Sequence, residues 1–187
     1  MRAYIDESTH VEPPGLYVLA AVVVPVRDED RTRDVLLRNV RPGQKRFHWR
    51  EEDSQTRDRM ATAVGGLDLA TVMAVSTPID HRRSERARRA CLTQLLWELE
   101  QRDVGHVLFE SRHDRNRHDR AHILAMQKAR HLAQPLRYDF GGPLQEPLLW
   151  LPDLVAGAVN FARGGREEHC LAALGPGVVI VDVGAST

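Results

Sequence analysis

The sequence predicts a mixed α/β domain, in which helices cover both faces of a central sheet that begins with an N-terminal β-hairpin. Two observations predict this class. The first is a pair of strand-like segments at the N-terminus, separated by a stretch that contains Pro13, Pro14 and Gly15. The second is the alternation of later strand-like and helical segments. The 187 residues, 42% hydrophobic and 28% charged, fit a single globular domain spanning residues 1–187.

The expected strands are recognised by short apolar runs or by alternating residues. Residues 2–6 and Leu16–Val24 form the predicted antiparallel hairpin, with residues 7–15 as its loop. Residues 106–109 form a later strand that delivers Glu110 at its end. Further strands are expected at residues 46–49, as a short edge strand, and at residues 69–76, 136–140 and 178–183.

The expected helices carry apolar residues at a helical period. The longest covers residues 84–102, and its apolar positions are Ala87, Cys91, Leu95 and Leu99. Another helix begins near Ser54, a suitable N-cap, and closes at Gly65 and Gly66. Further helices are expected at residues 28–40 and 117–131, and residues 144–163 contain the last long helix.

Composition limits the classes of function. The formal net charge is zero, so no bulk positive field indicates a nucleic-acid partner. Lys45 and Lys128 are the only lysines, and the many arginines reflect either codon usage in a GC-rich genome or phosphate recognition by guanidinium groups. The longest apolar run, Leu16–Val24, is too short to cross a bilayer, and residues 1–10 lack a signal-peptide core. We therefore expect a cytoplasmic protein without membrane contact.

Cysteine and histidine spacing gives no clear zinc motif. Cys91 and Cys170 lack CxxC spacing, so they predict neither a zinc knuckle nor a disulfide framework, and a reducing compartment is the simpler assumption. His118 and His122 lie four residues apart, a spacing that can chelate zinc on a helix. Without an HExxH motif or a clear third ligand, a solvated basic helical face is the preferred interpretation of this pair.

Three acidic residues that are far apart in the sequence could meet at one site: Asp6, Glu110 and Asp153. Asp6 lies in a predicted strand, where aspartate is disfavoured. It could instead start a turn through an Asx hydrogen bond. Glu110 ends a strand, where acids often line sites in α/β sheets, but it could also form a solvated pair with Arg112.

Asp153 also has two interpretations. It follows Pro152, so a helix could begin there and the carboxylate could merely complement the helix dipole. If the segment is continuously helical, Asp153 shares one stripe with Glu146, Gly157 and Asn160. Gly157 would then let this polar stripe approach the sheet closely.

A His-x-x-Glu pair and three tryptophans are further candidates for binding. His48 and Glu51 would share one face of a helix as ligand, proton shuttle or substrate contact, or they form a surface pair at the start of the helix. Trp49, Trp97 and Trp150 could stack on bases, although Trp97 fits better in the core because it lies on the long amphipathic helix.

Four motifs together resemble a bacterial family, domain of unknown function 3800. In chain order they are Tyr4-Ile5-Asp6-Glu7-Ser8, Phe47-His48-Trp49-Arg50-Glu51, Leu108-Phe109-Glu110-Ser111 and Leu149-Trp150-Leu151-Pro152-Asp153-Leu154-Val155-Ala156-Gly157. They span residues 2–162, and the first and last motifs are the more specific. The family usually has glycine after Asp-Glu-Ser, where this chain has Thr9.

The resemblance implies a ribonuclease-H-like fold with a metal-binding aspartate on its first strand, matched by Asp6. It implies a second acidic ligand in the C-terminal helix, matched by Asp153. His48 and Glu51 match the family's His-plus-acid segment, and Glu110 stands where an acid after a central strand is expected. Such a resemblance does not establish an activity, because one fold hosts many functions.

The first functional hypothesis is a divalent-metal-dependent nuclease that hydrolyses phosphodiester bonds in DNA or RNA. Its metal, Mg²⁺ or Mn²⁺, would be held by Asp6, Glu110 and Asp153. Glu51 or His48 would position water or a leaving group. Phosphates of the nucleic-acid partner would be held by Arg46, Arg50 and Arg112.

The alternative is a non-catalytic module that uses the same scaffold to bind nucleic acid or protein. The neutral net charge favours this alternative, whereas the acids concentrated in the matched motifs favour the enzyme. The oligomeric state stays open at this point, with a homodimer as one option.

Overall fold

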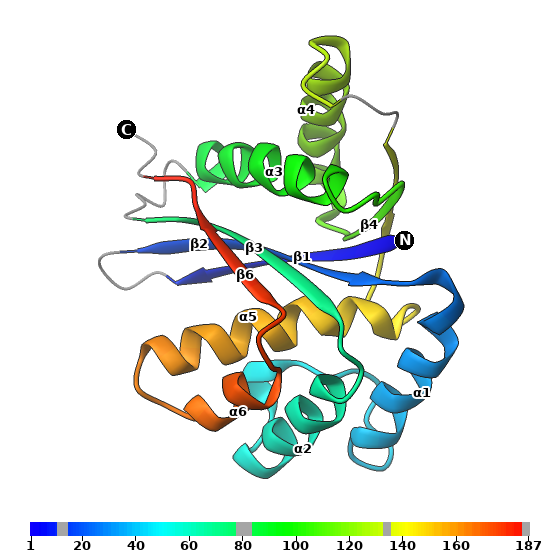
Figure 1. Ribbon diagram of the computed structural model, residues 1–187, viewed down its shortest axis with the longest axis vertical. Helices are drawn as coiled ribbons and strands as arrows, with labels where there is room; N and C mark the ends of the chain where they lie inside the picture. Colours follow the sequence, from blue (N-terminus) through cyan, green and yellow to red (C-terminus); the bar gives the residue numbers. More distant parts are fainter. Residues whose placement is uncertain (11–14, 78–83, 133–135, 185–187) are drawn as a thin grey trace.

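The computed structural model describes residues 1–10, 15–77, 84–132 and 136–184 (Figure 1). Within these residues a six-stranded mixed sheet has the strand order β5-β4-β1-β2-β3-β6. Its strands are β1 (Arg2–His10), β2 (Leu16–Val24), β3 (Ala70–Ser76), β4 (His106–Glu110), β5 (Arg137–Gly141) and β6 (Val178–Asp182). β1 and β3 pair antiparallel with β2, whereas β4 is parallel to β1 and β5, and β6 is parallel to β3.

The predicted N-terminal hairpin and the later strands of this sheet are confirmed, with one change of length. β1 continues beyond Asp6 to His10, because its pairing with β2 extends as far as His10 opposite Leu16. Residues 7–10 are therefore strand rather than loop. The predicted turn residues Pro13 and Pro14 lie outside the described residues.

The helices are α1 (Glu29–Asn39), α2 (Ser54–Gly65), α3 (Ser84–Glu100), α4 (Asn116–Lys128), α5 (Trp150–Arg163) and α6 (Glu168–Ala173). Short 3₁₀ turns, η2 (Trp49–Glu51) and η5 (Pro147–Leu149), precede α2 and α5. No helix in the described parts of the chain combines the length and the apolar character that a membrane span needs.

Helices cover both faces of the sheet, as the sequence predicts (Figure 1). α3 and α4 lie on one face, and α1, α2, α5 and α6 lie on the other. The alternation of β1 sends Ile5 into the core beneath α3 and Tyr4 into the core beneath α5. β2 is buried on both faces, which explains its continuous apolar run.

Two local predictions about secondary structure were wrong. Residues 46–49 form no strand, because Phe47 and Trp49 pack into the core on the α5 face instead of pairing with a strand edge. The N-cap of α2 is Asp53 rather than Ser54, since the Asp53 carboxylate accepts a 2.7 Å hydrogen bond from the Thr56 N–H. The last long helix, expected within residues 144–163, is α5, and η5 forms the turn that precedes it.

The tryptophans lie opposite to expectation. Trp97 is 46% exposed, because it falls outside the stripe of α3 formed by Leu92, Leu96 and Leu99. Trp49 and Trp150 are 1% and 2% exposed, so their rings are core residues and cannot stack on bases.

Candidate functional site

The register of the central strands places Asp6 and Glu110 beside each other. β1 and β4 run parallel, and Ile5 is paired with Phe109, so Asp6 lies level with Glu110. Ile5 and Phe109 both enter the core beneath α3. Because side chains alternate along a strand, Asp6 and Glu110 both point to the opposite face, which α5 covers.

Asp153 reaches the same face of the sheet from the first turn of α5. Its carboxylate Oδ2 accepts a 2.8 Å hydrogen bond from the backbone N–H of Trp49, so the carboxylate is positioned by a contact outside its own helix. Gly157, one turn later, allows this close packing: a Cβ at Gly157 would lie 2.1 Å from Cγ of Trp49. The close approach expected at Gly157 is therefore made to η2 rather than to the sheet.

The three carboxyl groups share one electrostatic environment. Burial raises the pKa of Asp6 well above its ordinary value, and the charges of Glu110 and Asp153 raise it further. Burial and then the charge of Asp153 raise the pKa of Glu110. Burial also raises the pKa of Asp153, against the opposing effect of the Trp49 N–H bond. A proton or a cation at this point would relieve the mutual repulsion.

The acids are close but do not meet at a single point. No choice of one oxygen each from Asp6, Glu110 and Asp153 brings all three within 4.8 Å of one another. Like charges repel, so an open arrangement is expected for three carboxylates without a counter-ion. Their donor atoms are all hard oxygens, and each group is partly accessible at the surface. This donor set fits Mg²⁺ or Mn²⁺ once the side chains turn inward.

Two of the three arginines expected at the site lie near the acids. The charges of Arg50 and Arg46 lower the pKa of Asp153, and that of Arg46 also lowers the pKa of Glu110. Arg50 is exposed and donates a 3.2 Å hydrogen bond to the carbonyl of Thr9, so it bridges η2 and the end of β1. A basic rim therefore borders the acidic centre.

His48 and Glu51 occupy different surroundings. Nδ1 of His48 lies 3.9 Å from Oδ2 of Asp153, and it is buried with no hydrogen-bond partner among the described residues. The side chain of Glu51 is 64% exposed, and it pairs with Arg46 at 3.4 Å. Glu51 ends the 3₁₀ turn η2, and His48 precedes that turn with extended backbone, so their spacing does not put them on one helical face. The structure brings His48 to the acids and leaves Glu51 at the surface.

The expectation that Arg112 holds phosphate was wrong. Arg112 is 10% exposed and lies on the opposite face of the sheet, with Glu7 at 3.3 Å and Asp119 at 3.6 Å, and it also pairs with Glu85. Because these buried and half-buried carboxylates already occupy the guanidinium, it is not available to a nucleic acid. The alternative pairing of Arg112 with Glu110 is not formed either.

A cleft of about 210 Å³ adjoins Asp153, and sequence reasoning did not identify it as a whole. Its lining consists of Ser8, Trp49, Arg50, Asp153, Gly157, Asn160, Phe161 and Arg166. The Asn160 amide donates to Oγ of Ser8 at 3.3 Å. Asn160 Oδ1 and Trp49 Nε1 are buried and lack partners among the residues that the structure describes. The predicted stripe of Asp153, Gly157 and Asn160 was the available signal, although Glu146 does not join it and instead pairs with Arg33.

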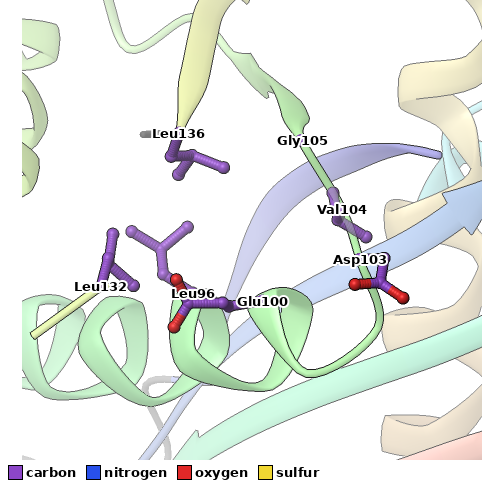
Figure 2. A pocket seen from close by; sticks show the side chains of 7 residues that line it. All are labelled: Leu96, Glu100, Asp103, Val104, Gly105, Leu132 and Leu136. Atoms are coloured by element: carbon purple, nitrogen blue, oxygen red, sulfur yellow. The ribbon is translucent and has the colours of Figure 1, made fainter. Parts of the chain in front are cut away.

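A second hollow, of about 170 Å³, is not part of this site (Figure 2). It is lined mainly by apolar residues, with Leu96, Leu132 and Leu136 facing one another across it. Val104 and Gly105, which also line it, immediately precede β4. The hollow therefore lies at the start of β4, whereas Glu110 lies at the end of that strand.

Comparisons with known proteins bear on the fold. No protein-family model matches the chain, and no curated protein matches it. Among solved structures, the ribonuclease HII in the PCNA:RNase HII complex from Archaeoglobus fulgidus matches with a TM-score of 0.51 and 18% sequence identity, over 90% of this chain and 73% of that chain. The fold is ribonuclease-H-like.

This match confirms the predicted fold class and goes no further, because at 18% identity the likeness shows the fold alone. The finer prediction, a relationship to the family of domain of unknown function 3800, stays a prediction. The function must be argued from the site itself.

Proposed function

We propose that this protein is a divalent-metal-dependent nuclease that hydrolyses phosphodiester bonds. One observation carries the proposal: Asp6, Glu110 and Asp153, from β1, β4 and α5, face one region of the sheet, where Glu110 and Asp153 raise the pKa of Asp6 and Asp153 raises that of Glu110. Three acids gathered in this way destabilise a fold unless a cation or a proton joins them. The ribonuclease-H-like fold and the basic rim support the same function.

The residues that would hold Mg²⁺ or Mn²⁺ are Asp6, Glu110 and Asp153. A divalent cation held there would offset the negative charge that develops on a phosphate during hydrolysis. The Trp49 N–H fixes one Asp153 oxygen at 2.8 Å and leaves the other oxygen available for a second contact. Asp6 is held in a similar way, because its Oδ1 accepts a 2.7 Å hydrogen bond from the Glu7 N–H.

The chain's other polar residues would bind and orient a nucleic-acid strand. Arg46 and Arg50 border the acids, where guanidinium groups can hold backbone phosphates. The cleft beside Asp153 would receive the adjoining nucleotide, with Arg166 at its edge. His48 lies close enough to Asp153 to hold or move a proton next to the reacting phosphate.

The test is a cleavage assay with labelled single-stranded DNA, duplex DNA, RNA and an RNA–DNA hybrid, each with Mg²⁺, Mn²⁺ or a chelator. We expect at least one substrate to be cut only with a divalent metal, and Asp6→Asn and Asp153→Asn to lower the rate by at least about 100-fold. Asp34→Asn is the matched control, because the Asp34 side chain lies on α1 and is 63% exposed.

Two other outcomes decide against the proposal. Cleavage that Asp6→Asn and Asp153→Asn leave at the native rate would place the activity elsewhere or in a contaminant. Binding of nucleic acid without cleavage under any metal would instead support the non-catalytic module, which the neutral net charge favours.

A further inference from the structure

We propose that Asp58, His169 and Cys170 form a second metal site, selective for zinc, that ties α6 to α2. Among the described residues, these three form the one group of His, Cys, Asp or Glu residues whose ligand atoms all lie within 4.8 Å of one another. The group lies outside the cleft and the acidic centre. Metal binding by this group would not depend on the proposed nuclease function.

The two distances from Nε2 of His169 to the other ligand atoms fit tetrahedral coordination. Nε2 of His169 lies 3.5 Å from Sγ of Cys170 and 3.6 Å from Oδ1 of Asp58. A zinc ion bonds nitrogen at about 2.0–2.1 Å and sulfur at about 2.3 Å, so neighbouring ligand atoms of a tetrahedron stand about 3.4–3.6 Å apart. The histidine nitrogen is therefore already at tetrahedral distance from both of its partners.

The donor atoms determine which metal the group would take. A thiolate, an imidazole and a carboxylate together suit Zn²⁺ or Co²⁺, whereas Mg²⁺ prefers oxygen ligands alone. The oxygen-only set of Asp6, Glu110 and Asp153 has the opposite preference. The two sites would therefore select different metals in the same protein.

The position of the group in the fold indicates a structural role. Cys170 is fully buried in the core on the α5 face, while Asp58 and His169 are 54% and 56% exposed on the adjoining surface. Asp58 belongs to α2, and the other two residues belong to α6, which packs against α2. The nearby ion pair of Arg57 and Glu167, with N–O distances of 2.6 and 2.7 Å, already joins the same two segments. A zinc ion would add a second link between them.

No standard sequence motif indicates this group. The two cysteines lie on opposite faces of the sheet, since Cys91 is in the core beneath α3 and Cys170 is in the core beneath α5. The third ligand, Asp58, is more than a hundred residues away from His169 and Cys170 in the sequence. Only the packing of α6 on α2 brings the three side chains together.

The test is titration of the full chain with Co²⁺ and then Zn²⁺, in excess Mg²⁺. A cobalt–thiolate bond gives a near-ultraviolet charge-transfer absorption that oxygen and nitrogen ligands do not give. We expect one Co²⁺ per chain with this absorption, displaced by Zn²⁺, and a higher melting temperature with Zn²⁺.

Variants assign the ligands. Cys170→Ala should abolish the thiolate absorption, and His169→Ala and Asp58→Asn should each weaken Zn²⁺ binding by at least about tenfold. The last two replace exposed side chains, so they test the site even if the buried Cys170→Ala variant does not fold. The matched controls Cys91→Ala, His118→Ala and Asp34→Asn should bind Zn²⁺ as the native chain does.

The proposal is overturned if the native chain gives no cobalt–thiolate absorption, or if His169→Ala and Asp58→Asn bind Zn²⁺ as tightly as the native protein. If His118→Ala weakens Zn²⁺ binding instead, the zinc site lies at the helical histidines of α4. None of these results depends on nuclease activity. The zinc site and the acidic centre are therefore tested separately.

Discussion

Asp6 and Glu7 are consecutive residues of β1, yet their carboxylates have opposite electrostatic surroundings on the two faces of the sheet. Asp6 faces α5 and meets the carboxylates of Glu110 and Asp153. Glu7 faces α3 and contacts the guanidinium of Arg88, whose Nη1 lies 2.6 Å from Oε2 of Glu7. One carboxylate therefore lies among like charges, and its neighbour lies against an opposite charge.

The Glu7 face forms a closed network of ion pairs. Arg88 donates two hydrogen bonds, at 2.8 and 2.7 Å, to the carboxylate of Asp119, and both side chains are 3% exposed. Arg88 also donates to the Tyr17 hydroxyl at 2.9 Å, and that hydroxyl donates to Glu7. Arg112 approaches Glu7 and Asp119 from the other side.

The comparison separates a structural cluster of charges from a candidate functional one. On the Glu7 face, buried arginines compensate the charges of the acids, although Nη1 of Arg112 has no hydrogen-bond partner among the described residues. On the Asp6 face, Arg46 and Arg50 border the acids, but in the described parts of the chain neither forms an ion pair with Asp6, Glu110 or Asp153, and the pKa of each acid stays raised. Uncompensated charge, rather than the number of acids, marks the candidate site.

Removing the cation of the Glu7 face should have the largest effect on stability. Arg88→Met leaves Glu7 and Asp119 without their buried partner, and we expect a loss of about 3–5 kcal/mol in the free energy of unfolding. Denaturant unfolding measures this loss, with the exposed Arg89→Met as the matched control. A loss below about 1 kcal/mol would show that the network does not hold the α3 face together.

A larger side chain at the contact between α5 and η2 should have the next largest effect on stability. Gly157→Ala places a Cβ 2.1 Å from Cγ of Trp49. We expect a loss of roughly 1–3 kcal/mol from overpacking, together with a lower nuclease rate because the Trp49 N–H bond to Asp153 is displaced. Gly105→Ala is the control, since its Cβ would meet nothing within 4 Å. Equal stability of the two variants would contradict the tight packing at Asp153.

Neutralising the two neighbours on β1 should change stability in opposite directions. Glu7→Gln weakens a charge-assisted pair with Arg88 and should destabilise the fold by roughly 1–2 kcal/mol. Asp6→Asn removes a like charge, so without divalent metal it should stabilise the fold by roughly 1 kcal/mol, or about 2–4 °C in melting temperature at neutral pH.

The pH dependence of this gain follows from the raised pKa of Asp6. A carboxyl with a raised folded-state pKa contributes stability below its ordinary value of 3.8, and this stability is lost as the pH rises through the raised value. The advantage of Asp6→Asn should therefore appear as the pH rises through that window and vanish below it. Melting curves across this pH range check the sign, and a variant that is less stable than native protein at neutral pH would refute it.

The smallest change in stability is expected at His48. Its side chain is 35% exposed, and its Nδ1 has no hydrogen-bond partner among the described residues, so His48→Ala should change the free energy of unfolding by less than about 0.5 kcal/mol. The same variant should lower the nuclease rate. A large loss of stability with full activity per folded molecule would make His48 a structural residue.

Much of this arrangement could be predicted from local patterns in the sequence. The hairpin, the strand before Glu110 and the helix that carries Asp153 all follow from hydrophobic period and turn residues. Once these elements form a sheet covered on both faces, the alternation of β1 decides that Asp6 and Glu7 point in opposite directions.

Other features depend on tertiary contacts that no local pattern encodes. Arg112 follows Glu110 closely in sequence, yet it pairs with Glu7 and Asp119 on the opposite face of the sheet from Glu110. Residues 46–49 look like an edge strand, but burial of Phe47 and Trp49 on the α5 face outweighs strand pairing. These tertiary contacts determine which carboxylates pair with an arginine. The sequence alone therefore could not distinguish the two clusters of charge.

A crystal structure of the full chain soaked in Mn²⁺, with the ion located by its anomalous scattering, would show whether the three acids bind a metal. We expect a peak bound by carboxylate oxygens of Asp6, Glu110 and Asp153, with those side chains turned inward, and no such peak in Asp6→Asn crystals. Anomalous density that is absent from these acids, or that occurs only at Asp58, His169 and Cys170, would contradict this expectation.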